Sequence, residues 1–222
     1  MGFGKTVETI EMLRLRGFND VVIVAPKPVC YQWADQIAMW WPERANDVGV
    51  FDLKKPITIV NYEKLLQTPV FSKLRSKRHD AVVLDEVHFI KTRDSKRTTA
   101  SKLLPANVHI GLTGTPILRQ PDDLWSLLNF VDPIYSCKSY CNFVKYFCNV
   151  EEGPFGRTIN GVIKNPDRLA LLKRVLELVT IRNEVVVAQG KRRVEVMLDM
   201  DEKQRDFYTK VKKLVLDELP PE

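Results

Sequence analysis

The chain has 222 residues, of which 45% are hydrophobic and 28% charged, proportions typical of a globular protein large enough to bury a real core. No apolar run approaches the ~20 residues that span a bilayer, and the amino terminus lacks a signal-peptide layout. These features exclude a membrane-spanning chain and predict a cytoplasmic protein, or a nuclear one in a eukaryote, while the formal net charge of +6 fits either a polyanionic partner or a plain solvated basic surface.

The first element is the second half of a phosphate-binding loop at the extreme amino terminus. Gly2 and Gly4 let the backbone approach a phosphate, Lys5 supplies a positive charge, and the Thr6 hydroxyl is suited to bind Mg²⁺. We expect a helix over about 7–16 to direct its free N–H groups at the same anion. The first residue of the full loop pattern would lie two positions before Met1.

Short apolar runs separated by helical patterns predict the centre of the fold. Such continuous runs are typical of strands buried on both faces, and their alternation with helices predicts a doubly wound parallel sheet. Ligands of such sheets bind at the carboxyl ends of the strands. The expected strands are Val21–Ala25, Ile57–Val60, Ala81–Leu84 and Val108–Leu112, and the expected helices are about Val29–Trp41, Tyr62–Leu66 and Thr98–Leu104.

Two of these strands end in groups that suit a nucleotide site. Asp85 follows the third strand and is suited to hold Mg²⁺, mostly through water, while Glu86 is suited to orient an attacking water. Thr113 and Thr115, in Thr-Gly-Thr-Pro after the fourth strand, place two hydroxyls and a sharp turn near a terminal phosphate. Taken alone, each of these two motifs also fits an ordinary polar strand end or turn.

The remainder of the chain is mostly helical in pattern. We expect helices over Leu124–Val131, after acidic residues, and from Asn165 to about Val179. A strand over Val194–Met200 and a helix over Glu202–Leu216 should follow. The cysteines Cys137, Cys141 and Cys148 do not match a zinc-binding spacing, so reduced, partly buried thiols are expected.

The motifs together resemble the Swi/Snf-like branch of superfamily 2 helicase-type DNA translocases. Met1-Gly2-Phe3-Gly4-Lys5-Thr6, Asp85-Glu86-Val87-His88 and Leu112-Thr113-Gly114-Thr115-Pro116 resemble its motifs I, II and III. Weaker similarities are Val24-Ala25-Pro26 with Trp33, Asn61-Tyr62-Glu63, and Ile181-Arg182-Asn183-Glu184, where Asn183 and Glu184 depart from the usual residues.

The resemblance implies a fold and a chemistry. The fold would be an α/β RecA-like P-loop NTPase lobe, a parallel sheet flanked by helices, with a C-terminal helical extension. ATP and Mg²⁺ would be the ligands, with Lys5, Asp85, Glu86 and His88 as catalytic residues. Double-stranded DNA would be the partner, contacted by Lys27, Asn61, Tyr62, Lys91 and Lys96. The residues themselves allow a plainer reading of the basic segment 91–102 as a solvated helix face, and of Trp33, Trp40 and Trp41 as packing residues rather than base-stacking platforms.

The resemblance also implies a division of the chain. Residues 1–133 would be the ATP-binding lobe, 134–192 a helical family-specific insertion, and 193–222 a return strand and helix leading to a second RecA-like lobe. Since that lobe supplies arginine fingers, this polypeptide alone should hydrolyse ATP at little above background. The alternatives are a strand-separating or restriction-type helicase subunit and a non-catalytic binding module with a motor-like fold. The short insertions favour a bacterial or phage source.

Overall fold

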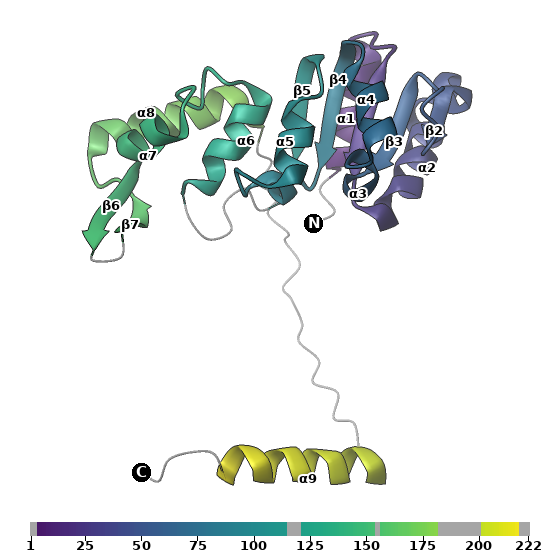
Figure 1. The fold of residues 1–222 in the computed structure, drawn as a ribbon. Helices are drawn as coiled ribbons and strands as arrows, with labels where there is room; N and C mark the ends of the chain where they lie inside the picture. Colours follow the sequence, from purple (N-terminus) through teal and green to yellow (C-terminus); the bar gives the residue numbers. More distant parts are fainter. Residues whose placement is uncertain (1–3, 115–120, 154–155, 182–200, 218–222) are drawn as a thin grey trace, which may run out of the picture. The chain divides into compact units, whose positions relative to one another are not determined.

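The structure is a computed structural model that describes residues 4–114, 121–153, 156–181 and 201–217. Contacts divide the chain into two compact units, Met1–Asn183 and Glu184–Glu222. Within the described residues, the first unit holds all the strands and every helix except the last (Figure 1). Among the helices that these residues form, none is long and apolar enough to cross a membrane.

A parallel sheet forms the centre of the first unit. Its strand order is β2-β3-β1-β4-β5, and each neighbouring pair is parallel. The predicted parallel sheet is therefore confirmed, with strand ends shifted by a residue or two and one short strand, β2, added. The strands are β1 (Val21–Ala25), β2 (Val48–Val50), β3 (Ile57–Asn61), β4 (His79–Asp85) and β5 (Ala106–Leu112).

Helices cover both faces of this sheet because successive strand residues point to opposite faces. In β1, Val21, Ile23 and Ala25 pack in one cluster with α1 (Lys5–Leu15) and α2 (Cys30–Trp40). Val22 and Val24 belong to a second cluster on the other face. That face is covered by α3 (Tyr62–Leu65), α4 (Thr68–Arg75) and α5 (Lys96–Lys102), and short 3₁₀ segments occupy Lys27–Val29, Pro42–Asp47 and Val87–Ile90.

The tryptophans near α2 pack as expected for core and rim residues. Trp33 is 0% and Trp41 7% exposed, whereas Trp40 is 43% exposed at the helix end. The buried pair therefore belongs to the packing beneath the sheet, within the same cluster as Ile23.

The rest of the first unit packs around a third cluster. It consists of α6 (Asp123–Val131), α7 (Tyr140–Phe147), a hairpin of β6 (Cys148–Gly153) and β7 (Gly156–Val162), and α8 (Pro166–Val179). Phe143, in this cluster, is 0% exposed. The Asn165 side chain accepts a hydrogen bond from the Arg168 N–H and begins α8 as predicted.

The prediction of a wholly helical segment 134–192 is wrong at the hairpin. Gly153 pairs with Gly156, and β6 and β7 form an antiparallel pair where a helix was expected. Gly156 has φ +113°, a conformation that a residue with a side chain adopts only with strain.

The second unit, in its described part, is the helix α9 (Glu202–Asp217). The Gln204 N–H donates to Asp201 Oδ1 at 2.8 Å, which begins the helix close to the predicted position. The predicted strand Val194–Met200 lies outside the described residues.

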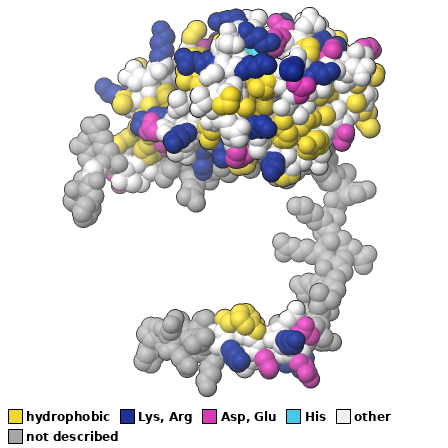
Figure 2. Space-filling view, turned by 45° about the vertical axis from the view of Figure 1, so that its right-hand side comes forward, with side chains coloured by type: hydrophobic (Ala, Val, Ile, Leu, Met, Phe, Trp, Pro, Cys, Tyr) yellow, Lys and Arg dark blue, Asp and Glu magenta, His cyan; other side chains and the backbone are white. Residues whose placement is uncertain are grey.

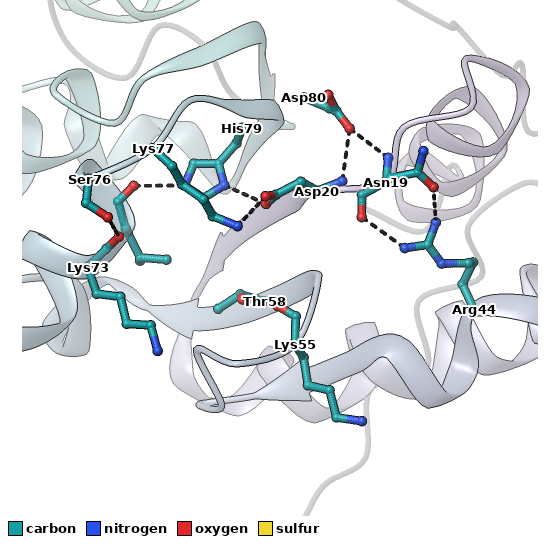
Figure 3. Close-up of polar contacts among 11 residues, drawn as sticks. Asn19, Asp20, Arg44, Lys55, Thr58, Lys73, Ser76, Lys77, His79 and Asp80 are labelled. Atoms are coloured by element: carbon teal, nitrogen blue, oxygen red, sulfur yellow. Dashed lines mark hydrogen bonds and ion pairs between the residues drawn. The ribbon is translucent and has the colours of Figure 1, made fainter.

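A polar network ties together the amino-terminal ends of β1 and β4 (Figure 3). The buried ring of His79 places Nδ1 2.7 Å from Asp20 Oδ1 and Nε2 2.8 Å from the Leu74 carbonyl oxygen. Asp20 also accepts a hydrogen bond from Lys77, and Asp80 Oδ2 accepts from the N–H groups of Asn19 and Asp20. This network lies at the end of the strands opposite to that of Asp85, so its role is structural.

We expect Asp20→Asn to destabilise the protein by about 1 kcal/mol at neutral pH, a low value because the carboxylate is partly exposed. Partial burial raises the pKa of Asp20, but the hydrogen bonds and charges of Lys77 and His79 outweigh it and hold the pKa below its ordinary value. A lowered carboxylate pKa stabilises the fold above the unfolded-state pKa of about 3.9, and that stability is lost as pH falls through the folded-state pKa. The difference between variant and wild type in urea titrations should therefore be present at about pH 7 and shrink as pH falls below the unfolded-state pKa of about 3.9. A stability difference between variant and wild type that does not change with pH would contradict this prediction.

Candidate functional site

The carboxyl ends of the strands bring the two principal motifs to one pocket. This pocket, of about 480 Å³, is named here the Lys5 pocket. Within the described residues it joins the start of α1 to the end of β4, as the order of the motifs predicts for a nucleotide site. Its lining residues are Gly4, Lys5, Thr6, Val7, Val29, Gln32, Trp33, Asp35, Gln36, Asp85 and Glu86.

The start of α1 provides the groups that suit an anion. Gly4 is the N-cap, with φ +75°, and the helix begins at Lys5. A Cβ at Gly4 would meet nothing within 4 Å, so the backbone conformation rather than space requires glycine here. The free N–H groups of the first turn, the Lys5 ammonium and the Thr6 hydroxyl thus share one end of the helix. Gly2 lies outside the described residues.

Asp85 is held at the end of β4 by donors from both faces of the sheet. Trp33 Nε1–H donates to Asp85 Oδ2 at 2.9 Å, and the Tyr62 hydroxyl donates to the Asp85 carbonyl oxygen at 2.7 Å. The Glu86 N–H donates to Oδ1 at 2.9 Å. Each carboxylate oxygen therefore accepts one bond and keeps capacity for another.

The pocket fits a magnesium ion that is shared with a ligand. Asp85 is only 9% exposed, and among the described residues no Lys, Arg or His forms an ion pair with it. A buried carboxylate without a cationic partner favours a bound cation. No cluster of three His, Cys, Asp or Glu side chains in the described part of the chain could hold a metal. Magnesium with few protein ligands fits this arrangement, since Mg²⁺ commonly binds one or two carboxylates together with phosphates and water.

Glu86, His88 and Thr113 connect the ends of β4 and β5. Glu86 has φ +49°, a left-handed conformation that is costly for a residue with a side chain and is common at functional sites. His88 Nδ1 lies 3.1 Å from Glu86 Oε2 and 3.3 Å from Thr113 Oγ1. The structure thus places these three predicted residues in one hydrogen-bonded group, while Thr115 lies outside the described residues.

Burial fixes the protonation of two groups behind the pocket. Burial, reinforced by the charge of Asp85, raises the pKa of the Tyr62 hydroxyl, which therefore stays a donor at any physiological pH. Burial and the charges of Glu63 and Asp85 raise the pKa of the Cys30 thiol to about 11. Cys30 is therefore a packing residue and a poor nucleophile.

A second hollow, also of about 480 Å³, lies where three predicted DNA-contacting residues meet; it is named here the Arg97 groove. Lys27 is exposed there, but Tyr62 is 0% and Asn61 7% exposed. The Asn61 side chain instead accepts from the Lys64 N–H and donates to Glu63. The lining residues are Pro26, Lys27, Pro28, Asn61, Tyr62, Glu63, Phe89 and Arg97.

The other two predicted contacts, Lys91 and Lys96, are not among the residues that line this groove. Lys91 Nζ lies 4.0 Å from Asp123 Oδ2, and Lys96 is exposed at the first position of α5. The neighbouring Arg97 lines the groove, and sequence reasoning missed it along with Phe89. The only sequence signal for Arg97 would have been the helical periodicity of the basic segment. Adjacent residues of a helix point about 100° apart, so Lys96 and Arg97 face different directions.

Comparisons with known proteins agree with this geometry. The model of the SNF2-related domain matches residues 1–219. The DNA annealing helicase and endonuclease ZRANB3 of Bos taurus is 28% identical over 82% of this chain, and the human SWI/SNF-related matrix-associated actin-dependent regulator of chromatin subfamily A member 1 is 25% identical over 95%. The chain spans 18% and 21% of the length of these two relatives.

A solved structure supports the same assignment. The Sulfolobus solfataricus SWI2/SNF2 ATPase core in complex with dsDNA superposes with a TM-score of 0.67 and 25% identity, over 82% of this chain and 38% of that one. The fold is therefore that of SNF2 ATPase cores, a RecA-like parallel sheet between helices. With its pocket at the strand ends and a family model that matches nearly its whole length, the chain belongs to the SNF2-related domain family.

Proposed function

We propose that this chain is the ATP-binding lobe of a Swi/Snf-like DNA-dependent ATPase that translocates on double-stranded DNA. The observation that carries the proposal is the Lys5 pocket, which is lined both by a helix amino terminus with Lys5 and Thr6 and by the buried carboxylate of Asp85, for which the described residues provide no ion-pair partner. One related protein is described as a DNA annealing helicase and endonuclease, and one related core is described as an ATPase core in complex with dsDNA.

The proposal assigns a role to each predicted catalytic residue and to Thr6. Lys5 and the first N–H groups of α1 hold the phosphates, and Thr6 and Asp85 hold Mg²⁺. Bound Mg²⁺ would neutralise charge on the phosphate oxygens. Glu86, whose backbone is left-handed, orients and polarises the attacking water. His88 links Glu86 to Thr113, so the position of the water-orienting carboxylate depends on β5.

We assign DNA binding to the Arg97 groove and do not base it on the net charge of the chain. On the face drawn in Figure 2, Lys and Arg side chains are spread among Asp and Glu. The net charge of +6 therefore supports a polyanion only weakly. In the groove, Lys27 is exposed and the Arg97 side chain is 33% exposed, beside a wall of proline and aromatic side chains. Phosphate contacts of this kind give affinity without sequence preference, as translocation requires.

A second RecA-like lobe, in the same chain or another, completes the proposal. Arginine fingers from such a lobe raise related rates by about 10³–10⁵. We therefore expect the 222-residue polypeptide to bind Mg-nucleotide but to hydrolyse ATP at little above background, even with DNA. Single-turnover assays with labelled ATP measure this, and robust DNA-stimulated turnover would contradict it.

The direct test is binding of two ligands by the full chain. Isothermal titration with ATPγS in the presence of Mg²⁺ should show one site that ADP competes for and EDTA weakens. Fluorescence anisotropy with a labelled short duplex should show binding that weakens steeply as salt rises. Absence of nucleotide binding at millimolar ATPγS would refute the proposed function.

A further inference from the structure

Tyr62 lies between the Lys5 pocket and the Arg97 groove and touches groups that belong to each. Its hydroxyl donates to the Asp85 carbonyl oxygen at 2.7 Å. On the groove side, the Arg97 guanidinium carbon lies 5.4 Å from the centroid of the Tyr62 ring, and the Phe89 ring meets it edge to face at 5.4 Å. The side chain itself is 0% exposed, so Tyr62 cannot be a direct DNA contact.

We propose that Tyr62 is the positioning residue through which a DNA phosphate in the Arg97 groove changes the affinity of the Lys5 pocket for Mg-nucleotide. This inference rests on the proposed function, because it assigns the two ligands to those two sites. It names the route by which one site acts on the other.

Arg97 is free to respond to a phosphate because its present partner is weakly bound. Arg97 pairs with Glu63 at 3.2 Å, with the two side chains 33% and 65% exposed. Ion pairs so open to solvent contribute little to stability, whereas a phosphate offers Arg a two-pronged, charge-assisted contact. A phosphate in the groove therefore draws the guanidinium away from Glu63 and changes its position over the Tyr62 ring.

A shift of the Tyr62 ring reaches both carboxylates of the pocket. The ring is packed without exposure against the sheet, so its displacement moves the hydroxyl and, through it, the Asp85 backbone. Asp85 holds the Mg²⁺ position, and the next residue, Glu86, already has a strained left-handed backbone. A strained backbone responds to small displacements of its neighbours, so the turn at Glu86 is suited to respond to a movement of Tyr62.

Trp33 provides a matched control for this route. Trp33 also bonds Asp85, at 2.9 Å through Nε1, but from the opposite face of the sheet, in the cluster with α1 and α2. It lines the Lys5 pocket and is not among the residues that line the Arg97 groove. Trp33→Phe therefore removes a hydrogen bond to the Asp85 carboxylate, while the contacts of Tyr62 with Asp85 and with the Arg97 groove remain.

The test measures the coupling between the two ligands in the full chain. The dissociation constant of a fluorescent ATP analogue with Mg²⁺ is determined without and with saturating short duplex, and the ratio is the coupling factor. The reciprocal titration of the duplex must give the same factor. Circular dichroism melts confirm that Tyr62→Phe, Trp33→Phe and Arg97→Gln are folded at the assay temperature.

We expect a coupling factor of about fivefold or more in the wild type, the range usual between linked sites. Tyr62→Phe should bring the factor to within about twofold of unity, and Arg97→Gln should do the same while weakening duplex binding. Trp33→Phe should weaken nucleotide binding in both conditions and retain the wild-type factor.

The outcomes separate this inference from the proposed function. If both ligands bind but the wild-type factor is unity, or Tyr62→Phe keeps the wild-type factor, the Tyr62 route is overturned and the proposed function stands. If the wild type fails to bind Mg-nucleotide or fails to bind the duplex, the proposed function fails and this inference fails with it.

Discussion

Lys5→Ala is expected to weaken the binding of Mg-ATPγS by about 30-fold or more, because loss of one charged partner of a phosphate costs about 2 kcal/mol or more. The side chain lines the pocket at the first position of α1, and no described intramolecular ion pair involves it. Helix α1 should persist, since alanine favours helix. The Thr9 hydroxyl donates to the backbone carbonyl oxygen at position 5, which the substitution keeps. Titration calorimetry measures the change.

Lys27→Ala is the matched control for Lys5→Ala. Each variant removes one lysine ammonium, but Lys27 lines the Arg97 groove instead of the Lys5 pocket. We expect Lys27→Ala to weaken duplex binding by a few fold and lower its salt dependence by about one phosphate contact, with ATPγS affinity retained. Equal loss of nucleotide affinity in the two variants would contradict the assignment of Lys5.

Asp85→Asn is expected to remove most of the magnesium dependence of nucleotide binding. With Mg²⁺ present, affinity for ATPγS should fall about tenfold or more, because the carboxylate charge acts on the cation at close range. In EDTA the variant should bind at least as tightly as the wild type, since it no longer repels the nucleotide phosphates. The asparagine oxygen can still accept from Trp33 Nε1–H, while the side-chain bond from the Glu86 N–H is lost.

Glu86→Gln is the control for charge alone. It removes one negative charge at the next residue, on the rim of the same pocket, without removing the proposed Mg²⁺ ligand. Binding of ATPγS with Mg²⁺ should change by less than about threefold, since the proposed Mg²⁺ ligand stays in place and the Glu86 side chain is partly open to screening by solvent. An identical loss in Glu86→Gln and Asp85→Asn would show that the pocket senses net charge and that Asp85 has no specific role.

Much of the fold follows from the apolar pattern of the chain. Runs such as Val21–Ala25 are apolar at every position because both faces of the strand are covered, and this pattern identified β1, β3, β4 and β5. Strand β2 was missed because Val48–Val50 is a three-residue edge strand with a central glycine, too short for a periodic signal. The β6–β7 hairpin was missed because both strands are mostly polar and neither contains a continuous apolar run, although their pairing partners lie close together in the sequence.

The local chemistry of the site could be read from residue types, whereas its contacts could not. Asn61 and Tyr62 line the Arg97 groove, but their burial was not visible in the sequence. Lys96 was predicted and its neighbour Arg97 was not, since only the rotation of α5 shows which of the two basic side chains lines the groove.

The sequence by itself determined which groups suited to phosphate and magnesium this protein carries: Gly4, Lys5 and Thr6 at a helix start, and Asp85 and Glu86 at a strand end. Short motifs suffice for this because each depends on backbone geometry within a few residues. Only the tertiary structure decided how these groups are held and connected. Trp33 and Tyr62 meet Asp85 across 52 and 23 residues of sequence, and Arg97 meets Glu63 across 34. Such contacts arise when the parallel strands align, so no local pattern of residues encodes them.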